Sequence, residues 1–519
     1  METPPSIADQ DACYLALKAR DARFDGRFFT GVTSTGIYCR PVCAVRTPKR
    51  ENCRFFAHAA RAESEGFRPC LRCRPELAPD AVQPWSIQDA SSILAHQAAR
   101  LLDDPDAWNG GELSVQALAT RLGVSDRHLR RIFESALGVS PLQYLQTRRL
   151  LTAKQLLADT RLSMTQVALS SGFASVRRFN AAFVAQYRLN PTQMRRAGAA
   201  PAQAGTTVRL GYRPPYDVPA MGQFLHKRQV HAVEHVAQDV QGAWRFARTL
   251  RLPDTAGRLH AGWLVARFDP ARPQLLLQVS DGLREVLPAV IRRARQAYDL
   301  DAEPAAINAV LHASFPDGDG LRVPGAFDGF ELAVRAVLGQ QITVAAARTL
   351  AQRLVDRFGE PLDTPHPELS RLFPTPATLA HASADDIGAL GIVRQRQGAI
   401  QSLARAVALH GLTLHAGADV AATITALKAL PGIGDWTAQY IAMRALRWPD
   451  AFPSGDVALH KALGVQGHKQ AARAAEEQSA SWRPWRSYAV LRAWSTLPTA
   501  GTPSAPAPRT PPPARRPTP

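Results

Sequence analysis

The chain has 519 residues, with 62 Lys and Arg against 44 Asp and Glu and a formal net charge of +18 at pH 7. This length exceeds one hydrophobic core and implies several domains. The positive charge indicates a polyanionic partner, of which nucleic acid is the leading one. No run approaches the roughly 20 apolar residues of a membrane helix, and the first residues lack the apolar core of a signal peptide. We therefore expect a cytoplasmic protein with no membrane contact.

Four cysteines near the N-terminus stand in two short-spaced pairs. Cys39 and Cys43 have three residues between them, and Cys70 and Cys73 have two. Two such pairs can present four thiolates to one tetrahedral ion, usually zinc, and disulfides are disfavoured in a reducing compartment. We interpret residues 1–80 as a small four-cysteine zinc domain. Closed sites of this kind are usually structural, but an exposed zinc thiolate is also a nucleophile toward electrophilic carbon.

The next segment, residues 86–197, contains a helical unit that occurs twice. Ser125 and Pro141 recur 50 residues later as Ser175 and Pro191. In each copy a helix, a glycine turn and an N-capping serine precede a second helix, which is the order of a helix-turn-helix motif. The alternative is a plain helical bundle with solvated basic faces. The arginines that we assign to DNA contact follow the two serines: Arg127, Arg130, Arg131, Arg177 and Arg178.

The rest of the chain divides into three segments with different predicted secondary structure. Strand-like stretches at Gly262–Phe268 and Gln274–Val279 mix with helical spacing in residues 208–310, which predicts an α/β subdomain. Residues 311–497 have helical spacing throughout, with short Gly and Pro breaks. Residues 498–519 are proline-rich, and we expect them to form a disordered tail.

A short glycine-rich motif and a lone acid stand out in the helical segment. The sequence Pro-Gly-Ile-Gly at residues 431–434 predicts a hairpin between two helices, in which Gly432 and Gly434 allow backbone amides to approach a DNA phosphate. Asp456 follows the next helical run, after a glycine. Its simplest role is the N-cap of a helix beginning at Val457, and the alternative is a catalytic carboxylate.

The flanks of the cysteine pairs carry a specific motif. Thr35-Gly-Ile-Tyr-Cys39-Arg-Pro and Gly66-Phe-Arg-Pro-Cys70, with both cysteine spacings, resemble the Ada family of methylation sensors over residues 9–78. The resemblance implies that Cys39 accepts a methyl group from a methylphosphotriester in DNA, with the other three cysteines as supporting zinc ligands. Methylation would remove one negative charge from the cluster and reduce its repulsion by DNA phosphates, which implies a switch that activates transcription.

The tandem helical unit is similar to the AraC-type DNA-binding domain over residues 86–196. The similarity implies sequence-specific binding to promoter DNA, with RNA polymerase as a further partner. Arg188 stands three residues before the closing Pro191, where that family usually has glycine. Because a left-handed backbone costs a non-glycine residue about 1 kcal/mol, we expect the second unit to end differently from the first.

Further motifs extend through the C-terminal half. Tyr212-Arg-Pro-Pro-Tyr-Asp217, Leu338-Gly-Gln-Gln-Ile342 and Trp482-Arg-Pro-Trp-Arg-Ser-Tyr488, with the hairpin and Asp456, resemble AlkA-type glycosylases of the helix-hairpin-helix superfamily. The resemblance implies a TBP-like α/β subdomain followed by an all-helical glycosylase domain that hydrolyses the N-glycosidic bond of alkylated bases such as 3-methyladenine.

The resemblance also assigns residues to this reaction. Asp456 would stabilise the sugar cation or orient the attacking water. A flipped cationic base suits an electron-rich pocket, and the matching aromatic residues are Trp436, Tyr440 and Trp494, which on their own would be ordinary helix-packing residues. Gln341 stands at the position of the family's DNA wedge, where an apolar side chain is usual, and we include it among the DNA-binding residues.

Two finer expectations concern chemistry at the hairpin. Related enzymes with lyase activity have a lysine at the position of Trp436, so we expect no Schiff-base strand cleavage. Similar hairpins hold a monovalent cation, which here would bind the carbonyls of Lys428, Leu430 and Ile433.

The whole chain is thus predicted to be multidomain and mainly α, acting on alkylated and promoter DNA. The alternative is a methylation-responsive transcription regulator whose glycosylase half only binds DNA.

Overall fold

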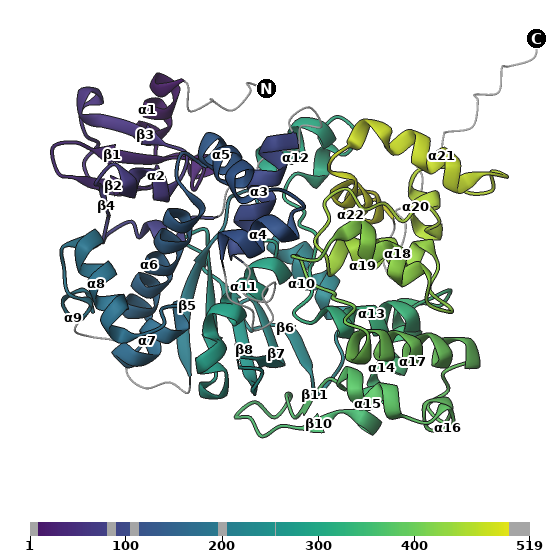
Figure 1. The fold of residues 1–519 in the computed structure, drawn as a ribbon. Helices are drawn as coiled ribbons and strands as arrows, with labels where there is room; N and C mark the ends of the chain where they lie inside the picture. The colour runs from purple at the N-terminus through teal and green to yellow at the C-terminus, as the bar shows by residue number, and fades with distance from the viewer. Residues whose placement is uncertain (1–8, 80–89, 104–113, 196–204, 255, 498–519) are drawn as a thin grey trace, which may run out of the picture.

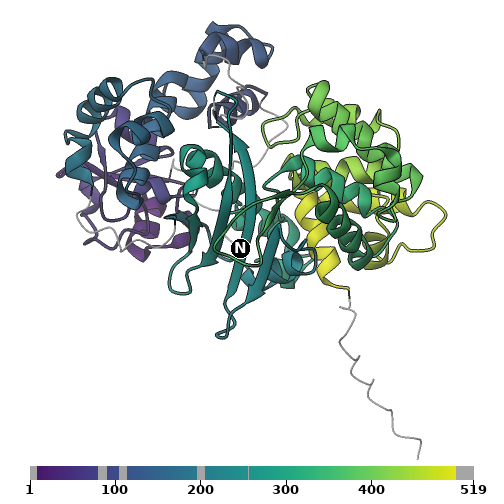
Figure 2. The ribbon, with the colours of Figure 1, turned by 90° about the horizontal axis from the view of Figure 1, so that it is seen from below.

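A computed structural model describes residues 9–79, 90–103, 114–195, 205–254 and 256–497. A five-stranded sheet lies in the middle of the molecule, with the N-terminal domains on one side and the C-terminal helices on the other (Figures 1 and 2). None of the described helices is long and apolar enough to cross a membrane. The predicted disordered tail, residues 498–519, lies outside the described residues.

The N-terminal domain is a small four-stranded sheet in the order β3-β1-β2-β4. Buried aromatic rings stabilise it, with Phe29 edge-on to Tyr38 at 5.7 Å and Phe56 against Phe67 at 5.4 Å between centroids. Such pairs contribute stability beyond the apolar area that they bury. Its elements are α1 (Gln10–Ala19), β1 (Phe29–Val32), β2 (Ile37–Cys39), β3 (Cys53–Phe56), α2 (Ala59–Ser64) and β4 (Arg68–Pro69).

The repeated helical unit is present as predicted. Ser125 and Ser175 each cap the second helix of a unit, accepting hydrogen bonds from His128 N and Arg178 N at 3.2 Å. The elements are α3 (Ala90–Asp103), α4 (Val115–Arg121), α5 (Asp126–Leu137), α6 (Pro141–Asp159), α7 (Met164–Ser170), α8 (Val176–Tyr187) and α9 (Pro191–Met194).

The expectation that the second unit ends differently is wrong. Arg188 takes the left-handed conformation (φ 53°) that Gly138 takes in the first unit (φ 72°). Each residue donates its N–H to the last turn of its helix, Gly138 to Glu134 O at 2.9 Å and Arg188 to Val184 O at 2.8 Å. The strain of about 1 kcal/mol is smaller than the combined gain from closing the helix and packing the chain that follows.

The two units differ instead in what they pack against. The first unit has a core of its own, formed by α3, α4 and α5 around Leu118, Leu129 and Phe133. The second unit shares a core with the central sheet, in which Phe179 and Phe183 belong to the same buried cluster as the sheet residues. The second unit is therefore held rigidly to the α/β subdomain.

The central sheet is antiparallel throughout, with strand order β5-β9-β8-β7-β6. The stretches predicted as strands form β8 and β9, and part of the segment with helical spacing forms α11. Its elements are β5 (Thr206–Gly211), α10 (Val218–His226), β6 (Glu234–Gln238), β7 (Trp244–Pro253), β8 (Leu259–Phe268), β9 (Gln274–Val279) and α11 (Leu287–Ala297).

The C-terminal part is helical apart from one short two-stranded ribbon, β10 (Glu360–Pro361) with β11 (Arg371–Leu372). Two buried clusters lie in it, one mainly under α13, α14 and α17 and one around α12, α20 and α22. Its helices are α12 (Pro304–Leu311), α13 (Gly329–Leu338), α14 (Val344–Phe358), α15 (Pro376–His381), α16 (Ala384–Gly388), α17 (Arg394–Leu409), α18 (Val420–Lys428), α19 (Asp435–Arg444), α20 (Val457–Ala462), α21 (Ala471–Gln478) and α22 (Arg486–Ser495).

A buried arginine joins the N-terminal domain to the α/β subdomain. Arg213, fully buried, donates to Asp25 O at 2.8 Å and to Pro79 O at 3.0 Å, and pairs with Glu303 at 3.0 Å. A buried charge is stable only when it is paired and hydrogen-bonded, so this contact fixes the small domain in place. The exact domain limits stay predictions, because residues 80–89 and 196–204 lie outside the described part of the chain.

Candidate functional site

The four cysteines predicted as a zinc site lie together at one end of the small sheet. Cys39 ends β2, Cys43 follows in the next turn, and Cys70 and Cys73 flank the turn after β4. Their sulfur atoms all lie within 4.8 Å of one another. A tetrahedral zinc ion with bonds of about 2.3 Å separates its sulfurs by about 3.8 Å. The donor set and its spacing therefore fit zinc.

Backbone N–H groups donate to several sulfurs of the cluster. Arg40 N donates to Cys73 at 3.3 Å, Val45 N to Cys43 and Cys73 N to Cys70. Hydrogen bonds stabilise a thiolate and lower its nucleophilicity, so these bonds reduce the reactivity of Cys43, Cys70 and Cys73.

Arg40 fixes the loop that carries Cys73. Its guanidinium donates to the Cys73 carbonyl at 3.0 Å and forms a buried ion pair with Asp25. Cys39 is 6% exposed, whereas Cys73 is half-buried. The sulfur cluster is therefore mostly covered by protein.

The predicted DNA-contacting arginines lie on the second helix of each unit. Arg127, Arg130 and Arg131 on α5, with Arg177 and Arg178 on α8, are all exposed. Arg130 pairs with Asp126 at 3.0 Å within α5. The connecting helix α6 has 19 residues, or about 28 Å at 1.5 Å per residue. This is close to the spacing of about 34 Å between successive major grooves.

Asp456 has two roles in the structure, because its carboxylate is both a helix cap and the centre of an aromatic site. One oxygen accepts from Leu459 N at 2.6 Å, which makes Asp456 the N-cap of α20. The same oxygen accepts from Trp494 Nε1 at 3.0 Å, and the other accepts from Trp436 Nε1 at 2.9 Å. Three N–H donors thus hold a half-buried carboxylate in one orientation.

The three predicted pocket residues form a continuous aromatic layer beside Asp456. Trp436 stacks on Tyr440 with centroids 5.4 Å apart and planes 11° from parallel, and Tyr440 lies 6.5 Å from Trp494. Trp436 and Tyr440 come from α19, and Trp494 comes from α22. The residue set predicted from the sequence is therefore brought together, with the electron-rich faces and the carboxylate adjacent.

The sequence analysis missed a fourth aromatic residue, Phe224, which α10 contributes from the α/β subdomain. It packs on the same cluster as Tyr440 and Trp494. Two guanidinium groups lie against its ring, with that of Arg228 3.8 Å and that of Arg444 5.0 Å from the ring centroid. Phe224 stands 212 residues before Trp436 in the chain, so no local spacing could have linked them.

The hairpin between α18 and α19 forms as predicted, and its two glycines serve different purposes. Gly432 has φ +80°, and a Cβ there would lie 2.8 Å from Ala399 Cβ, so the fold itself requires glycine. A Cβ on Gly434 would meet no atom within 4 Å. Gly434 therefore leaves open space at the start of α19, where a DNA backbone can approach the amides.

Gln340, in the turn between α13 and α14, links this turn to the hairpin by hydrogen bonds. Gln340 donates to Gly432 O at 2.9 Å and to Thr437 Oγ1 at 3.0 Å. Its neighbour Gln341 is exposed and left-handed, with φ 54°. Gln341 thus projects from the same surface as the hairpin, and its role as a wedge stays a prediction.

The hairpin carbonyls assigned to a monovalent cation also stay a prediction. The Leu430 carbonyl accepts from Ile433 N at 3.1 Å, and Lys428 pairs with Asp435 across the hairpin at 2.8 Å. These contacts close the turn, but they do not test cation binding.

Four family descriptions match successive parts of the chain. They are the metal binding domain of Ada over residues 12–76, a helix-turn-helix domain over 118–197, the AlkA N-terminal domain over 207–328, and the HhH-GPD superfamily of base excision DNA repair proteins over 334–487. The order of these matches agrees with the order of the domains predicted from the sequence.

Three relatives show how the parts combine. The chain is 39% identical over 503 residues to a probable bifunctional transcriptional activator/DNA repair enzyme AlkA of Mycobacterium tuberculosis, covering 94% of this chain and 97% of that protein. It is 36% identical to DNA-3-methyladenine glycosylase 2 of Escherichia coli, covering 55% and 96%. It is also 36% identical to the bifunctional transcriptional activator/DNA repair enzyme Ada of Escherichia coli, covering 31% and 42%.

Proposed function

Because the chain belongs to the family of bifunctional Ada- and AlkA-type transcriptional activators and DNA repair enzymes, we propose that it excises alkylated bases at Asp456 and senses methylated DNA at Cys39. The observation that carries the first activity is the carboxylate of Asp456 held by Trp436 and Trp494. The two activities would act on damaged DNA, and promoter binding by α5 and α8 would couple the second to transcription.

Base excision follows from the geometry around Asp456. An alkylated purine such as 3-methyladenine is cationic, so its glycosidic bond is already weak. Flipped out of the duplex, the base would stack on Trp436 and Tyr440, whose π faces attract a cation. As the bond from sugar to base breaks, positive charge develops on the sugar. The fixed carboxylate of Asp456 would stabilise this charge without reorganising, and water would complete the hydrolysis.

Methyl transfer would use the cysteine cluster once. Zinc, when bound, keeps the four sulfurs deprotonated at neutral pH. The sulfur of Cys39 would attack the methyl carbon, the carbon–oxygen bond would break, and its electron pair would leave on the phosphate. The resulting thioether is a poor leaving group, so each protein would react once. Backbone N–H donors to Cys43, Cys70 and Cys73 lower the nucleophilicity of those three sulfurs, which supports the choice of Cys39.

One assay tests the glycosylase proposal. Wild-type protein should release 3-methyladenine from methylated duplex DNA, and Asp456→Asn should not, because asparagine still caps α20 but carries no charge. Wild-type protein without base release would favour the alternative, a regulator whose glycosylase half only binds DNA.

A second assay tests the sensor proposal. Mass spectrometry after exposure to DNA with methylphosphotriesters should find one added methyl group, located on Cys39. Cys13 is a matched control, because it is buried outside the cluster. A methyl group on another cysteine, or none, would contradict the assignment.

A further inference from the structure

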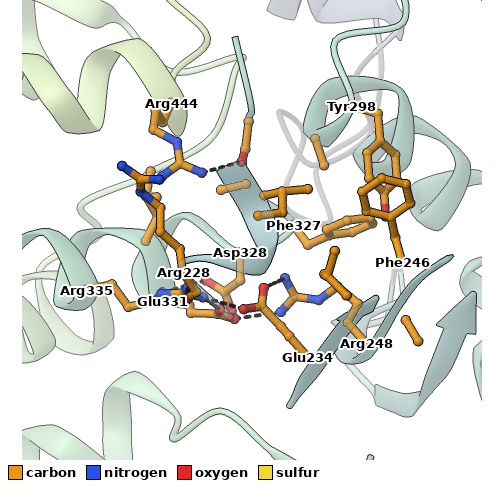
Figure 3. A pocket seen from close by; sticks show the side chains of 17 residues that line it. Arg228, Glu234, Phe246, Arg248, Tyr298, Phe327, Asp328, Glu331, Arg335 and Arg444 are labelled. Carbon is orange, nitrogen blue, oxygen red and sulfur yellow. Dashed lines mark hydrogen bonds and ion pairs between the residues drawn. The ribbon is translucent and has the colours of Figure 1, made fainter. Parts of the chain in front are cut away.

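Buried ion pairs join separate parts of this chain at several interfaces. One network lies between the central sheet and α13, within the glycosylase half (Figure 3). Its pairs measure 2.7–3.2 Å and join Arg248 and Arg335 to Glu234 and Glu331. Another network lies between the N-terminal domain and α6, and neither of the two proposed mechanisms uses it.

Four charged side chains form the network on α6. Arg74 follows Cys73 directly in the chain. Its guanidinium makes two parallel bonds to Asp159, at 2.6 and 2.9 Å, and donates to Glu76 at 2.9 Å. Glu76 also pairs with Lys154. The side chains of Glu76, Lys154 and Asp159 are at most 2% exposed. Because a buried charge is stable only when it is paired, the four side chains hold one another in place.

The network has one half on each domain. Arg74 and Glu76 belong to the turn η3 (Pro75–Leu77) and its N-cap, which follow the second cysteine pair. Lys154 and Asp159 lie in the last two turns of α6, the helix that connects the two helix-turn-helix units. Arg74 and Asp159 are 85 residues apart in the chain. A helix of the DNA-binding domain therefore holds the loop that carries Cys73.

The same helix holds the N-terminal domain at a second point. Thr147 of α6 donates to the buried carboxylate of Glu63 at 2.9 Å. Arg61 of α2 donates to Gly138 O, just before α6, at 3.1 Å. Thr147 and Lys154 are seven residues apart and so lie on one face of the helix. The N-terminal domain is thus attached along most of the length of α6.

The network restrains the backbone at Cys73. Arg74 has a left-handed backbone with φ 56°, which a residue with a side chain keeps only when its surroundings enforce it. The bond from Arg74 to Asp159 supplies this restraint, and Arg40 adds another by donating to Cys73 O at 3.0 Å. A zinc ligand must lie within about 0.2 Å of its ideal distance. The position of the Cys73 sulfur therefore depends on contacts made by α6.

We propose that Asp159 and Lys154 are positioning residues for the cysteine cluster and connect it to the helix-turn-helix domain. The inference rests on the proposed sensor function and deepens it. Linkage makes such a connection reciprocal. If α6 favours zinc binding, bound zinc stabilises α6 by the same factor, and with it the arrangement of α5 and α8. The sensor would then act on the DNA-binding helices by direct contact as well as by its charge.

The test measures how fast a chelator removes zinc from the full-length protein. Loss of a group that orients a metal ligand costs about 10–100-fold in metal affinity. Asp159 acts on Cys73 through one intervening residue, so Asp159→Asn should lose zinc about tenfold faster than wild type. Asp159→Glu should lose zinc at close to the wild-type rate, because glutamate keeps the charge that pairs with Arg74.

A double variant shows whether the effect passes through Arg74. In Arg74→Met the ion pair is already absent, so the further change Asp159→Asn should not accelerate zinc loss. Glu134→Gln is the matched control, since Glu134 is an exposed acid of α5 in the same domain. It should lose zinc at the wild-type rate. Additive effects of the two changes would overturn the proposal, as would a wild-type rate in Asp159→Asn.

Hydrogen exchange measures the reciprocal effect. Removal of zinc from wild-type protein should lower protection across residues 141–187, and in Asp159→Asn this change should be about tenfold smaller. Equal changes in the two proteins would overturn the proposal. Neither measurement uses methylated DNA. Wild-type protein that accepts no methyl group would therefore contradict the proposed function, whereas the zinc measurements would still decide the positioning role.

Discussion

The cysteine cluster and the Asp456 pocket differ in how far apart in the sequence their parts lie. All four cysteines fall within residues 39–73 of one small domain. The Asp456 site takes side chains from α10, α19 and α22 and from the N-cap of α20, which belong to two subdomains. The geometry of a site with closely spaced ligands is maintained mainly by the metal that they bind. The geometry of a site assembled from distant helices is maintained by the hydrophobic cores on which those helices pack. The two sites should therefore fail under different perturbations.

Metal removal should have the largest effect, and only on the first site. Binding of structural zinc contributes about 10 kcal/mol or more to folding, which is as large as the whole stability of a typical domain. A chelator should therefore abolish hydrogen-exchange protection over residues 29–70, while protection over residues 431–462 persists. Protection that survives in both regions would show that the small sheet is stable without metal.

Asp456→Asn should affect the glycosylase site and leave the cysteine cluster unchanged. Loss of one preorganised electrostatic group commonly costs about 10²–10³ in rate, so base release should fall by that factor. Methyl transfer to Cys39 should continue at the wild-type rate. Asp385→Asn is a control, because Asp385 is an exposed acid of the same helical domain. A parallel loss of methyl transfer would mean that the two sites are not independent.

A buried acid makes the sensor side sensitive to pH. Burial raises the pKa of Glu63 to about 7, although hydrogen bonds from Thr147 (2.9 Å) and Tyr38 (3.0 Å) and the nearby Lys154 oppose this. Because the folded state holds this proton more tightly than an unfolded chain with a pKa of 4.5, the contribution of Glu63 to stability is fully present below pH 4.5 and is lost as pH rises through 7.

Glu63→Gln should remove that dependence. The free energy of unfolding of the N-terminal half should increase by up to about 3 kcal/mol at pH 8 and change little at pH 5, as measured by urea titration with hydrogen exchange. Glu51→Gln is a control, since Glu51 is exposed. A mutant with the wild-type pH dependence would show that another group controls it.

The smallest expected effect concerns the orientation of Asp456. Trp436→Phe and Trp494→Phe each remove one N–H donor to the carboxylate while keeping an aromatic face. A hydrogen bond to a charged group is worth about 1.5–3 kcal/mol, or about 10- to 150-fold in rate. Because two of the three donors remain in each variant, we expect the lower end, roughly a tenfold slower base release. Trp244→Phe is a control, because the buried Trp244 N–H has no hydrogen-bond partner within the described part of the chain. Unchanged rates would assign the tryptophans to packing alone.

The domain order, the four-cysteine cluster and the helix-hairpin-helix followed from the sequence because each depends on local spacing. Cysteine pairs two or three residues apart must share a loop, and glycine at residues 432 and 434 between helical runs must form a turn. The end of the second helix-turn-helix unit was not predictable in this way. The left-handed strain at Arg188 is small beside the helix-closing bond and the packing that follows it.

The sequence by itself therefore determined which residues we expect to carry the chemistry: the cysteines, Asp456 and the three aromatic residues of α19 and α22. Only the tertiary structure decided what surrounds them. It brought Phe224 and Arg228 from the α/β subdomain to Tyr440, gave Asp456 three N–H donors, and gathered the four cysteine sulfurs within 4.8 Å of one another. Contacts between residues hundreds of positions apart depend on how the cores pack, and no local pattern in the sequence records that packing.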